Sequence, residues 1–250
     1  MKAVGRLSCL IAFAAGINAV WAGPPFRTDD PVPVDYQHWE IYTFSTATQI
    51  HGDVSGVLPG IEVNYGALDN LQLHIAAPLA FDRPEGRDAK FGYGDTEIGA
   101  KYRVLDPGED DWWPQAGFFP AVDFLSGNAR RGLGAGHTRA FLPLWLQKNF
   151  GSWTIDSGAG YWINPGAGNR NYWLFGWLVQ RQVTDKLALG GEIFHQTADT
   201  AAGTDSTGFN LGGVYDFTEH YHLLFSAGRG LQNAATTNEF SYYLAVQVTY

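Results

Sequence analysis

The chain ends in the stretch Phe240-Ser-Tyr-Tyr-Leu-Ala-Val-Gln-Val-Thr-Tyr250, in which apolar and more polar side chains alternate. Successive side chains of a β-strand point to opposite faces, so this stretch predicts a strand with one apolar face and one polar face. The apolar face begins at Phe240 and ends at Tyr250, both aromatic. Aromatic residues at both ends of an apolar face are typical of strands that face lipid in outer-membrane barrels. A strand of a soluble β-sandwich can alternate in the same way. The rest of the sequence is therefore needed to distinguish a membrane barrel from a soluble sandwich.

The first 22 residues have the pattern of a secretory signal peptide. Lys2 and Arg6 form a short positive region, and residues 7–20 are mostly apolar but too few to cross a bilayer as a helix. Val20-Trp21-Ala22 places small residues at the usual cleavage positions, which predicts a mature chain that starts at Gly23. Cys9 is the only cysteine and lies in this segment, so we expect neither disulfides nor thiolate metal ligands.

Composition favours a membrane barrel and excludes some other classes. The 250 residues include 31 Gly, 9 Trp, 12 Tyr and 16 Phe, which suits many twisted strands with aromatic belts. The formal net charge of -9 argues against a nucleic-acid partner. The histidines show no spacing typical of metal ligands, so neither a metal nor a cofactor is expected.

Alternating segments continue through residues 37–250 and predict about twelve strands. The connections between them are mostly alternately short and long, as in outer-membrane barrels with periplasmic turns and outer loops. The exceptions are 106–114, which is long for a turn, and 49–53, which is short for a loop. An even number of strands closes the sheet and leaves no unpaired edge in lipid. The predicted fold is therefore all-β, a closed antiparallel transmembrane β-barrel of about 12 strands. The expected strands are 37–48, 54–65, 71–80, 93–105, 115–126, 138–150, 153–163, 171–183, 186–198, 207–217, 221–231 and 240–250.

The two faces of these strands differ in charge. One phase is apolar, and the opposite phase carries charged residues in the middle of strands, where a cation on the lipid side would cost about 2–4 kcal/mol. These residues are predicted to line a polar lumen in which acids outnumber bases, which predicts a mild preference for cations. The candidates are Glu40, Glu62, His74, Asp95, Glu97, Lys101, Arg103, Asp123, Arg139, Asp156, Glu192, Asp216 and His222.

Large aromatic residues share the inward phase and would narrow the lumen. They are Tyr42, Phe119, Phe141, Trp145, Trp162, Phe194 and Tyr243.

The segment Gly23-Pro-Pro-Phe-Arg-Thr-Asp-Asp-Pro-Val-Pro-Val-Asp35 precedes the first strand, and its four prolines exclude a central strand. We expect residues 23–36 to form a periplasmic lead-in. Arg27, Asp29 and Asp30 are its candidate functional residues. The lead-in is expected to rest against the inner rim of the barrel, with its acids partly paired with Lys148 and Arg181, and to restrict the pore; a mobile periplasmic tail is the alternative.

The same segment, followed by Tyr36-Gln-His-Trp-Glu40, resembles the opening of a bacterial family of outer-membrane barrels. Members of that family are described as transporters or as related to a protein of a phenol-degradation (meta-pathway) route. The resemblance implies an outer-membrane barrel that transports solutes. No residue of this chain identifies phenol as a ligand.

We therefore expect an outer-membrane channel or transporter that passes small solutes passively, including aromatic or hydrophobic ones, and is not an enzyme. Its expected partners are outer-membrane lipid, the small solutes, and the barrel-assembly machinery, which would read the strand from Phe240 to Tyr250. One alternative is a lipid-modifying or ester-hydrolysing barrel that uses Ser226, His222 and Asn210. The other is a structural or adhesive barrel without transport.

Overall fold

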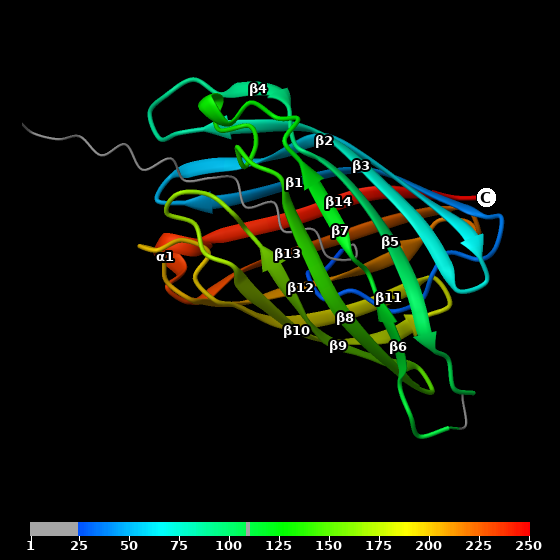
Figure 1. The fold of residues 1–250 in the computed structure, drawn as a ribbon. Helices are drawn as coiled ribbons and strands as arrows, with labels where there is room; N and C mark the ends of the chain where they lie inside the picture. The colour runs from blue at the N-terminus through cyan, green and yellow to red at the C-terminus, as the bar shows by residue number, and fades with distance from the viewer. Residues whose placement is uncertain (1–24, 109–110) are drawn as a thin grey trace, which may run out of the picture.

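The computed structural model describes residues 25–108 and 111–250, so the predicted signal peptide lies outside the described residues. Its strands form one continuous antiparallel sheet (Figure 1). A 3-10 helix, η1 (Ala129–Arg131), and a short helix, α1 (Ala234–Thr237), lie in the connections. The strands are β1 (Trp39–Ile50), β2 (Asp53–Leu68), β3 (Leu71–Arg83), β4 (Lys90–Tyr93), β5 (Thr96–Leu105), β6 (Gln115–Phe118), β7 (Ala121–Phe124), β8 (Arg139–Phe150), β9 (Trp153–Ile163), β10 (Tyr172–Thr184), β11 (Leu187–Gln196), β12 (Ser206–Asp216), β13 (Tyr221–Gln232) and β14 (Phe240–Thr249).

The sheet closes into a barrel of 12 strands, which confirms the predicted fold class. The short strand β4 and the longer strand β5 both pair with β3 and act as one barrel strand interrupted at Gly94 and Asp95. Likewise β6 and β7 both pair with β5 and β8 and are interrupted at Phe119 and Pro120. Proline has no N–H to donate to the ladder, which explains the second interruption. The first and last strands, β1 and β14, pair along their length and complete the ring.

The two ends of the barrel differ in their connections. At one end, which we call the turn end, the links 69–70, 151–152, 185–186 and 217–220 are short, and the chain terminates there. At the other, which we call the loop end, most links are longer, including 125–138 and 197–205. The turn end corresponds to the predicted periplasmic side.

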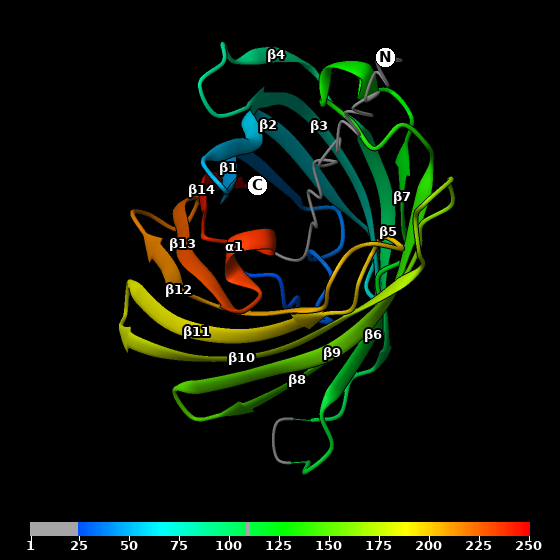
Figure 2. The same cartoon turned by 90° about the vertical axis from the view of Figure 1, so that its left-hand side faces the viewer.

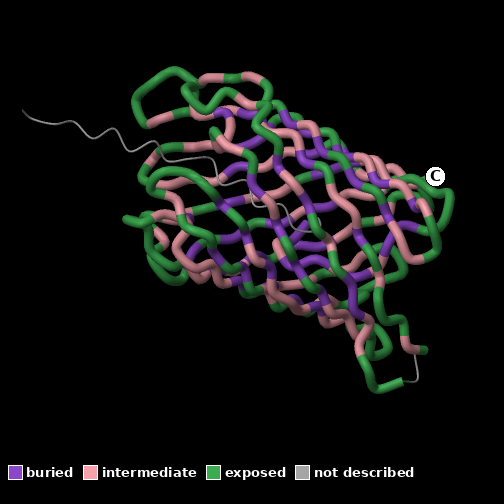
Figure 3. Tube along the Cα trace, viewed as in Figure 1, coloured by how far each residue is buried: buried purple, intermediate pink, exposed green. Residues whose placement is uncertain are grey.

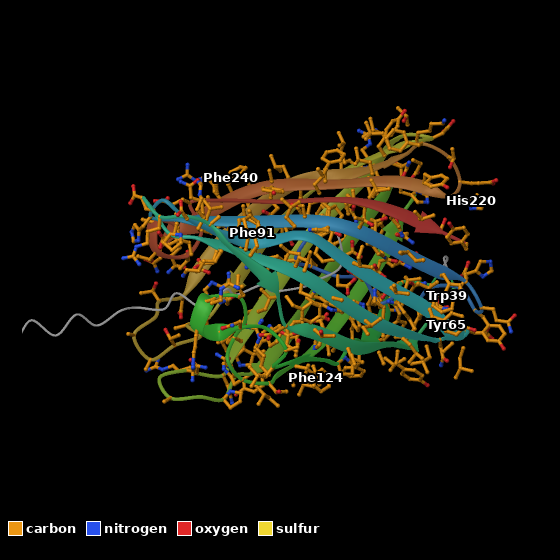
Figure 4. All side chains as sticks on the ribbon, turned by 90° about the horizontal axis from the view of Figure 1, so that it is seen from above. Trp39, Tyr65, Phe91, Phe124, His220 and Phe240 are labelled. Atoms are coloured by element: carbon orange, nitrogen blue, oxygen red, sulfur yellow. The ribbon has the colours of Figure 1, made fainter. Side chains whose placement is uncertain are left out.

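The outward face of the wall is apolar. In β14, Leu244 and Val246 are 47% and 45% exposed, whereas Ala245 between them is 2% exposed, which is the predicted phase of this strand. The same alternation of buried and exposed residues runs along the other strands in Figure 3. Exposed aromatic residues lie toward both ends, among them Trp39 at the turn end and Phe91 at the loop end (Figure 4). A continuous apolar belt with aromatic borders suits contact with lipid.

None of the described helices is long and apolar enough to cross a membrane.

Inward-facing glycines give large aromatic rings room to lie flat against the wall. Trp145 on β8 is paired with Gly158 on β9, where an added Cβ would lie 2.4 Å from the Trp145 ring. Phe194 on β11 is paired in the same way with Gly208 on β12, where the Cβ would again lie 2.4 Å from the ring. A glycine in a strand often marks such a close approach. The rings therefore lie along the wall and do not extend across the lumen.

Candidate functional site

Residues 25–35, which we call the plug, lie inside the barrel. Phe26, Thr28 and Asp29 are at most 4% exposed, and Val34 is 7% exposed. Figure 2 looks along the barrel from the loop end and shows the start of the described chain, in blue, within the ring of strands. The candidate functional site is therefore the lumen together with the segment that occupies it.

One side of the plug is anchored to Glu192 on β11. The Glu192 carboxylate accepts hydrogen bonds from the backbone N–H groups of Arg27 and Thr28, both at 2.8 Å. It also accepts one from the Thr28 hydroxyl at 2.8 Å and one from the Asn210 amide at 2.6 Å. On β13, the Ser226 hydroxyl donates to the carbonyl of Pro25. A carboxylate that accepts several hydrogen bonds holds the chain more firmly than a neutral acceptor would.

The other side of the plug is anchored to β5 and β3. Lys101 Nζ lies 3.0 Å from an Asp29 carboxylate oxygen and 3.4 Å from one of Asp30. The Val34 N–H donates to the Gln72 side chain at 3.0 Å. In the order of strands around the barrel, β3 and β5 are well separated from β11 and β13, so the plug crosses the lumen.

These contacts correct the expected position of the lead-in. Instead of pairing with Asp29 and Asp30 at the inner rim, Lys148 donates to the backbone carbonyl of Asp111, and the Arg181 guanidinium lies 5.2 Å from the Trp153 ring. The acids pair with Lys101 deeper in the barrel, where a buried ion pair with further hydrogen bonds is less screened by water than one at the rim.

Two glycines of the wall make room for the plug. A Cβ at Gly176 on β10 would lie 2.2 Å from Thr28 Oγ1, and a Cβ at Gly117 on β6 would lie 2.9 Å from Pro31. Both glycines lie in one inward-facing row of residues that are paired from strand to strand. In order, the row is Gly117, Trp145, Gly158, Gly176 and Phe194. The plug thus fits a groove that is built into the wall.

A cavity of about 380 Å³, which we call the inner cavity, remains between the plug and the wall. At its side His74 bridges two acids: Nε2 lies 3.0 Å from Glu97, and Nδ1 lies 3.6 Å from Glu62 and 2.7 Å from Asn64. The cavity is lined mostly by polar groups of β1, β2, β3 and β5. Its lining includes Asp29, Asp30, Glu40, Tyr42, Glu62, Asn64, Gln72, His74, Glu97, Lys101, Phe119, Gln147 and Gln247.

Most of the predicted lumen residues occupy inward positions. Eight of them, on strands from β2 to β11, are at most 6% exposed: Glu62, His74, Glu97, Lys101, Asp123, Arg139, Asp156 and Glu192. Glu40 is half-buried and accepts a hydrogen bond from the Tyr42 hydroxyl at 2.7 Å. His222 Nδ1 lies 2.6 Å from Asp216 near the turn end.

Two predicted lumen residues have other positions. Asp95 lies in the break between β4 and β5, where its carboxylate accepts hydrogen bonds from the N–H groups of Gly127 and Ala135 at 2.8 and 2.6 Å and orders a connection at the loop end. Because the strand is interrupted there, the phase that predicted an inward side chain no longer applies. Arg103 lies at the turn end, 3.1 Å from Asp106 and 3.3 Å from the Asp69 carbonyl.

An aromatic stack covers the inward face of β8, β9 and β10 near the loop end. Phe141, Trp162 and Tyr172 are cross-strand partners, and their ring centroids are 4.7 and 5.9 Å apart with nearly parallel planes. We call these three residues the aromatic ladder. The Arg139 guanidinium lies 4.7 Å from the Trp162 ring and is held by Asp123 at 2.7 Å.

Sequence reasoning missed several polar residues of the site, namely Thr28, Asn64, Gln72 and Gln147. The three strand residues among them share the inward phase of the charged candidates, so the same alternation could have found them.

The structure does not bring the proposed hydrolase residues together. Ser226 and His222 are four residues apart on β13, a separation of about 13 Å along a strand. Ser226 donates to Pro25, Asn210 donates to Glu192, and His222 contacts Asp216. Within residues 25–108 and 111–250, no cluster of histidine and acidic side chains has the arrangement of a metal site.

No protein-family model and no curated protein matches this sequence. Among solved structures, the chain is similar to the COG4313 outer membrane channel from Pseudomonas putida F1, with a TM-score of 0.68 at 17% identity over 88% of this chain and 97% of that one. It is also similar to the KdgM porin, with a TM-score of 0.58 at 10% identity over 84% and 99% of the two chains. For the NanC porin the TM-score is 0.57 at 9% identity over 83% and 98%. The chain has the fold of outer-membrane channels; the relation to phenol degradation is not tested by these likenesses and stays a prediction.

Proposed function

We propose that the protein is a passive channel of the bacterial outer membrane that passes small solutes. The observation that carries this proposal is the inner cavity: a polar space of about 380 Å³ enclosed by a closed barrel with an apolar outer belt. In this function the turn end faces the periplasm and the loop end faces outward. The similarity of its fold to those of the solved channel structures supports the proposal.

The size and lining of the lumen support small solutes, including aromatic ones. A cavity of this volume is at the lower end of the range for small-molecule sites. The rings of Tyr42 and Phe119 line the inner cavity and offer apolar contact to such solutes. The plug reduces the free lumen, so its removal should increase the passage of solutes.

An enzyme is supported less well than a channel. The serine proposed as a nucleophile, Ser226, is engaged by the plug, and it lies four residues, about 13 Å along the strand, from the proposed base on β13. General-base activation needs the two groups within hydrogen-bond reach.

Solute flux tests the channel directly. Purified protein in liposomes should allow passage of a pentose such as arabinose and exclude the trisaccharide raffinose, measured by osmotic swelling against protein-free liposomes. We also expect export with loss of residues 1–22 and heat-modifiable migration in detergent gels. The proposal is wrong if neither the native protein nor a variant without the plug passes arabinose while both show heat-modifiable migration.

A further inference from the structure

The inner cavity carries an excess of negative charge. Among the described residues, five acids and two bases line it. Each base is shared by two acids: Lys101 contacts Asp29 and Asp30, and His74 contacts one acid of β2 and one of β5. Acids that outnumber bases in a confined space raise the local concentration of cations, because water screens their charge only weakly there.

Two of the five acids are incompletely paired. Asp29 lines the cavity and is 2% exposed, yet its Oδ2 has no hydrogen-bond partner among the described residues. Glu40 accepts a hydrogen bond from the neutral hydroxyl of Tyr42, and no cation of the described residues forms an ion pair with it. A buried carboxylate oxygen without a donor is costly, so the cavity favours a ligand that brings a cationic donor.

The cavity has room for an organic ligand and is open to solvent. Its volume of about 380 Å³ is far larger than a single ion needs and lies in the range of small-molecule sites. The Asp30 side chain is 41% exposed and Glu40 is half-buried, so solvent reaches both residues. A solute that enters the lumen can therefore reach them.

One side of the cavity is apolar. Tyr42, Val214 and Leu224 line it and pack together in one cluster. Glu40 lies two residues before Tyr42 on β1, and its carboxylate is 2.7 Å from the Tyr42 hydroxyl. An acid at the edge of an apolar side suits a ligand with a cationic end and an apolar body, and a tyrosine ring itself attracts cations.

We propose that the inner cavity binds small primary amines that carry an apolar body. The proposal rests on the channel function and names a class of solute for it. The ammonium group donates hydrogen bonds to the Glu40 carboxylate, and its charge offsets part of the acidic excess of the cavity. The apolar body packs against the side formed by Tyr42, Val214 and Leu224. A neutral molecule of the same shape lacks the first contact, and an inorganic cation lacks the second.

The test is calorimetric titration of the protein, purified from outer membranes in detergent, with phenethylamine and with phenethyl alcohol. The alcohol has the same ring and chain but a neutral hydroxyl in place of the ammonium group. At about pH 8 the amine keeps its charge. Potassium chloride at about 0.1 M supplies a competing inorganic cation and screens nonspecific attraction. We expect the amine to bind about tenfold more tightly than the alcohol.

Two substitutions separate the charged contact from the apolar one. Glu40→Gln keeps the size of the side chain and removes its charge, so it should raise the Kd of the amine about tenfold and leave that of the alcohol unchanged. Val214→Asn places a polar group on the apolar side, so it should weaken the binding of both. Asp30→Asn is a second charge variant, which replaces Glu40→Gln if that protein loses heat-modifiable migration.

Glu219→Gln is the matched control. It makes the same substitution in a turn outside the cavity, where the side chain is 87% exposed, so neither affinity should change.

The site is refuted if the amine does not bind, if the alcohol binds as tightly, or if the charge variants leave the affinity for the amine unchanged. Arabinose flux is measured separately. A protein that passes arabinose without preferring the amine refutes only the site. One that prefers the amine but passes no solute, with or without the plug, refutes only the channel.

Discussion

The inner cavity and the aromatic ladder are both formed by inward-facing side chains of the strands, but those side chains make different kinds of contact. In the inner cavity, polar side chains bind one another: His74 bridges Glu62 and Glu97, and Lys101 is paired with acids of the plug. On the ladder, Trp162 and Tyr172 keep donors without partners among the described residues. Charged groups that bind one another favour a single arrangement of the inner cavity, although Asp29 Oδ2 has no partner among the described residues, whereas the ladder is held by the packing of its rings.

The plug connects these two regions. Its acids pair with Lys101 beside the inner cavity, and its Arg27 lies over Phe194 beside the ladder. Whatever moves the plug therefore changes both regions together, which gives three ways to test the comparison.

Removal of the plug should have the largest effect. Deleting residues 23–35 removes the plug, residues 25–35, which crosses the lumen beside the inner cavity. We expect a several-fold higher single-channel conductance and faster arabinose flux than in the native protein. Unchanged conductance in a variant that still migrates in a heat-modifiable manner would show that the segment does not occlude the lumen.

A single substitution can displace the plug without deleting it. A side chain at Gly176 would collide with Thr28, so Gly176→Val should also raise conductance. Gly108→Val is the matched control, because none of the described residues has an atom within 4 Å of a Cβ at that position.

Weakening one anchor should have an intermediate effect. Glu192→Gln replaces a carboxylate that accepts four hydrogen bonds with an amide that has only one acceptor oxygen. Hydrogen bonds to charged groups contribute about 1.5–3 kcal/mol each, so losing one should increase the population with a displaced plug roughly tenfold or more. Single-channel recordings should show more frequent openings of the size seen in the deletion variant. Openings as rare as in the native protein would mean that Glu192 does not hold the plug closed.

The alternation of apolar and polar residues predicted those features that are determined within a single strand. It predicted the number of strands, the outward phase of Leu244 and Val246, and the inward position of Trp145 and Trp162, because a strand's two faces are set by its own sequence. It misplaced Asp95, because the strand containing it is interrupted by a break that no alternation signals.

The position of the plug could not be predicted in this way. Its groove includes Gly117 and Gly176, which become neighbours along one row only when the register of every strand between them is known. Its anchors, Lys101 and Glu192, are far apart in the sequence and become opposite walls only when the barrel closes. A proline-rich segment carries no alternation of its own, so its sequence indicated an extended chain but not where that chain lies.

The smallest effect concerns ion preference. Among the described inward residues, acids outnumber bases, and a confined lumen with that excess should favour cations. Glu40 is suited to the test, because it is half-buried beside the inner cavity and its hydrogen-bond partner, Tyr42, is neutral. Glu40→Gln should shift the reversal potential across a potassium chloride gradient by a few millivolts toward zero, in both the native and the plug-deleted protein. The shift should be small because the other acids remain.

Glu219→Gln is the control: Glu219 lies at the same end of the barrel but in a turn, with its side chain 87% exposed, so its charge should be screened by solvent ions. A native reversal potential that indicates anion preference would refute the acidic lumen, and equal shifts in the two variants would show that Glu40 does not face the conducting path.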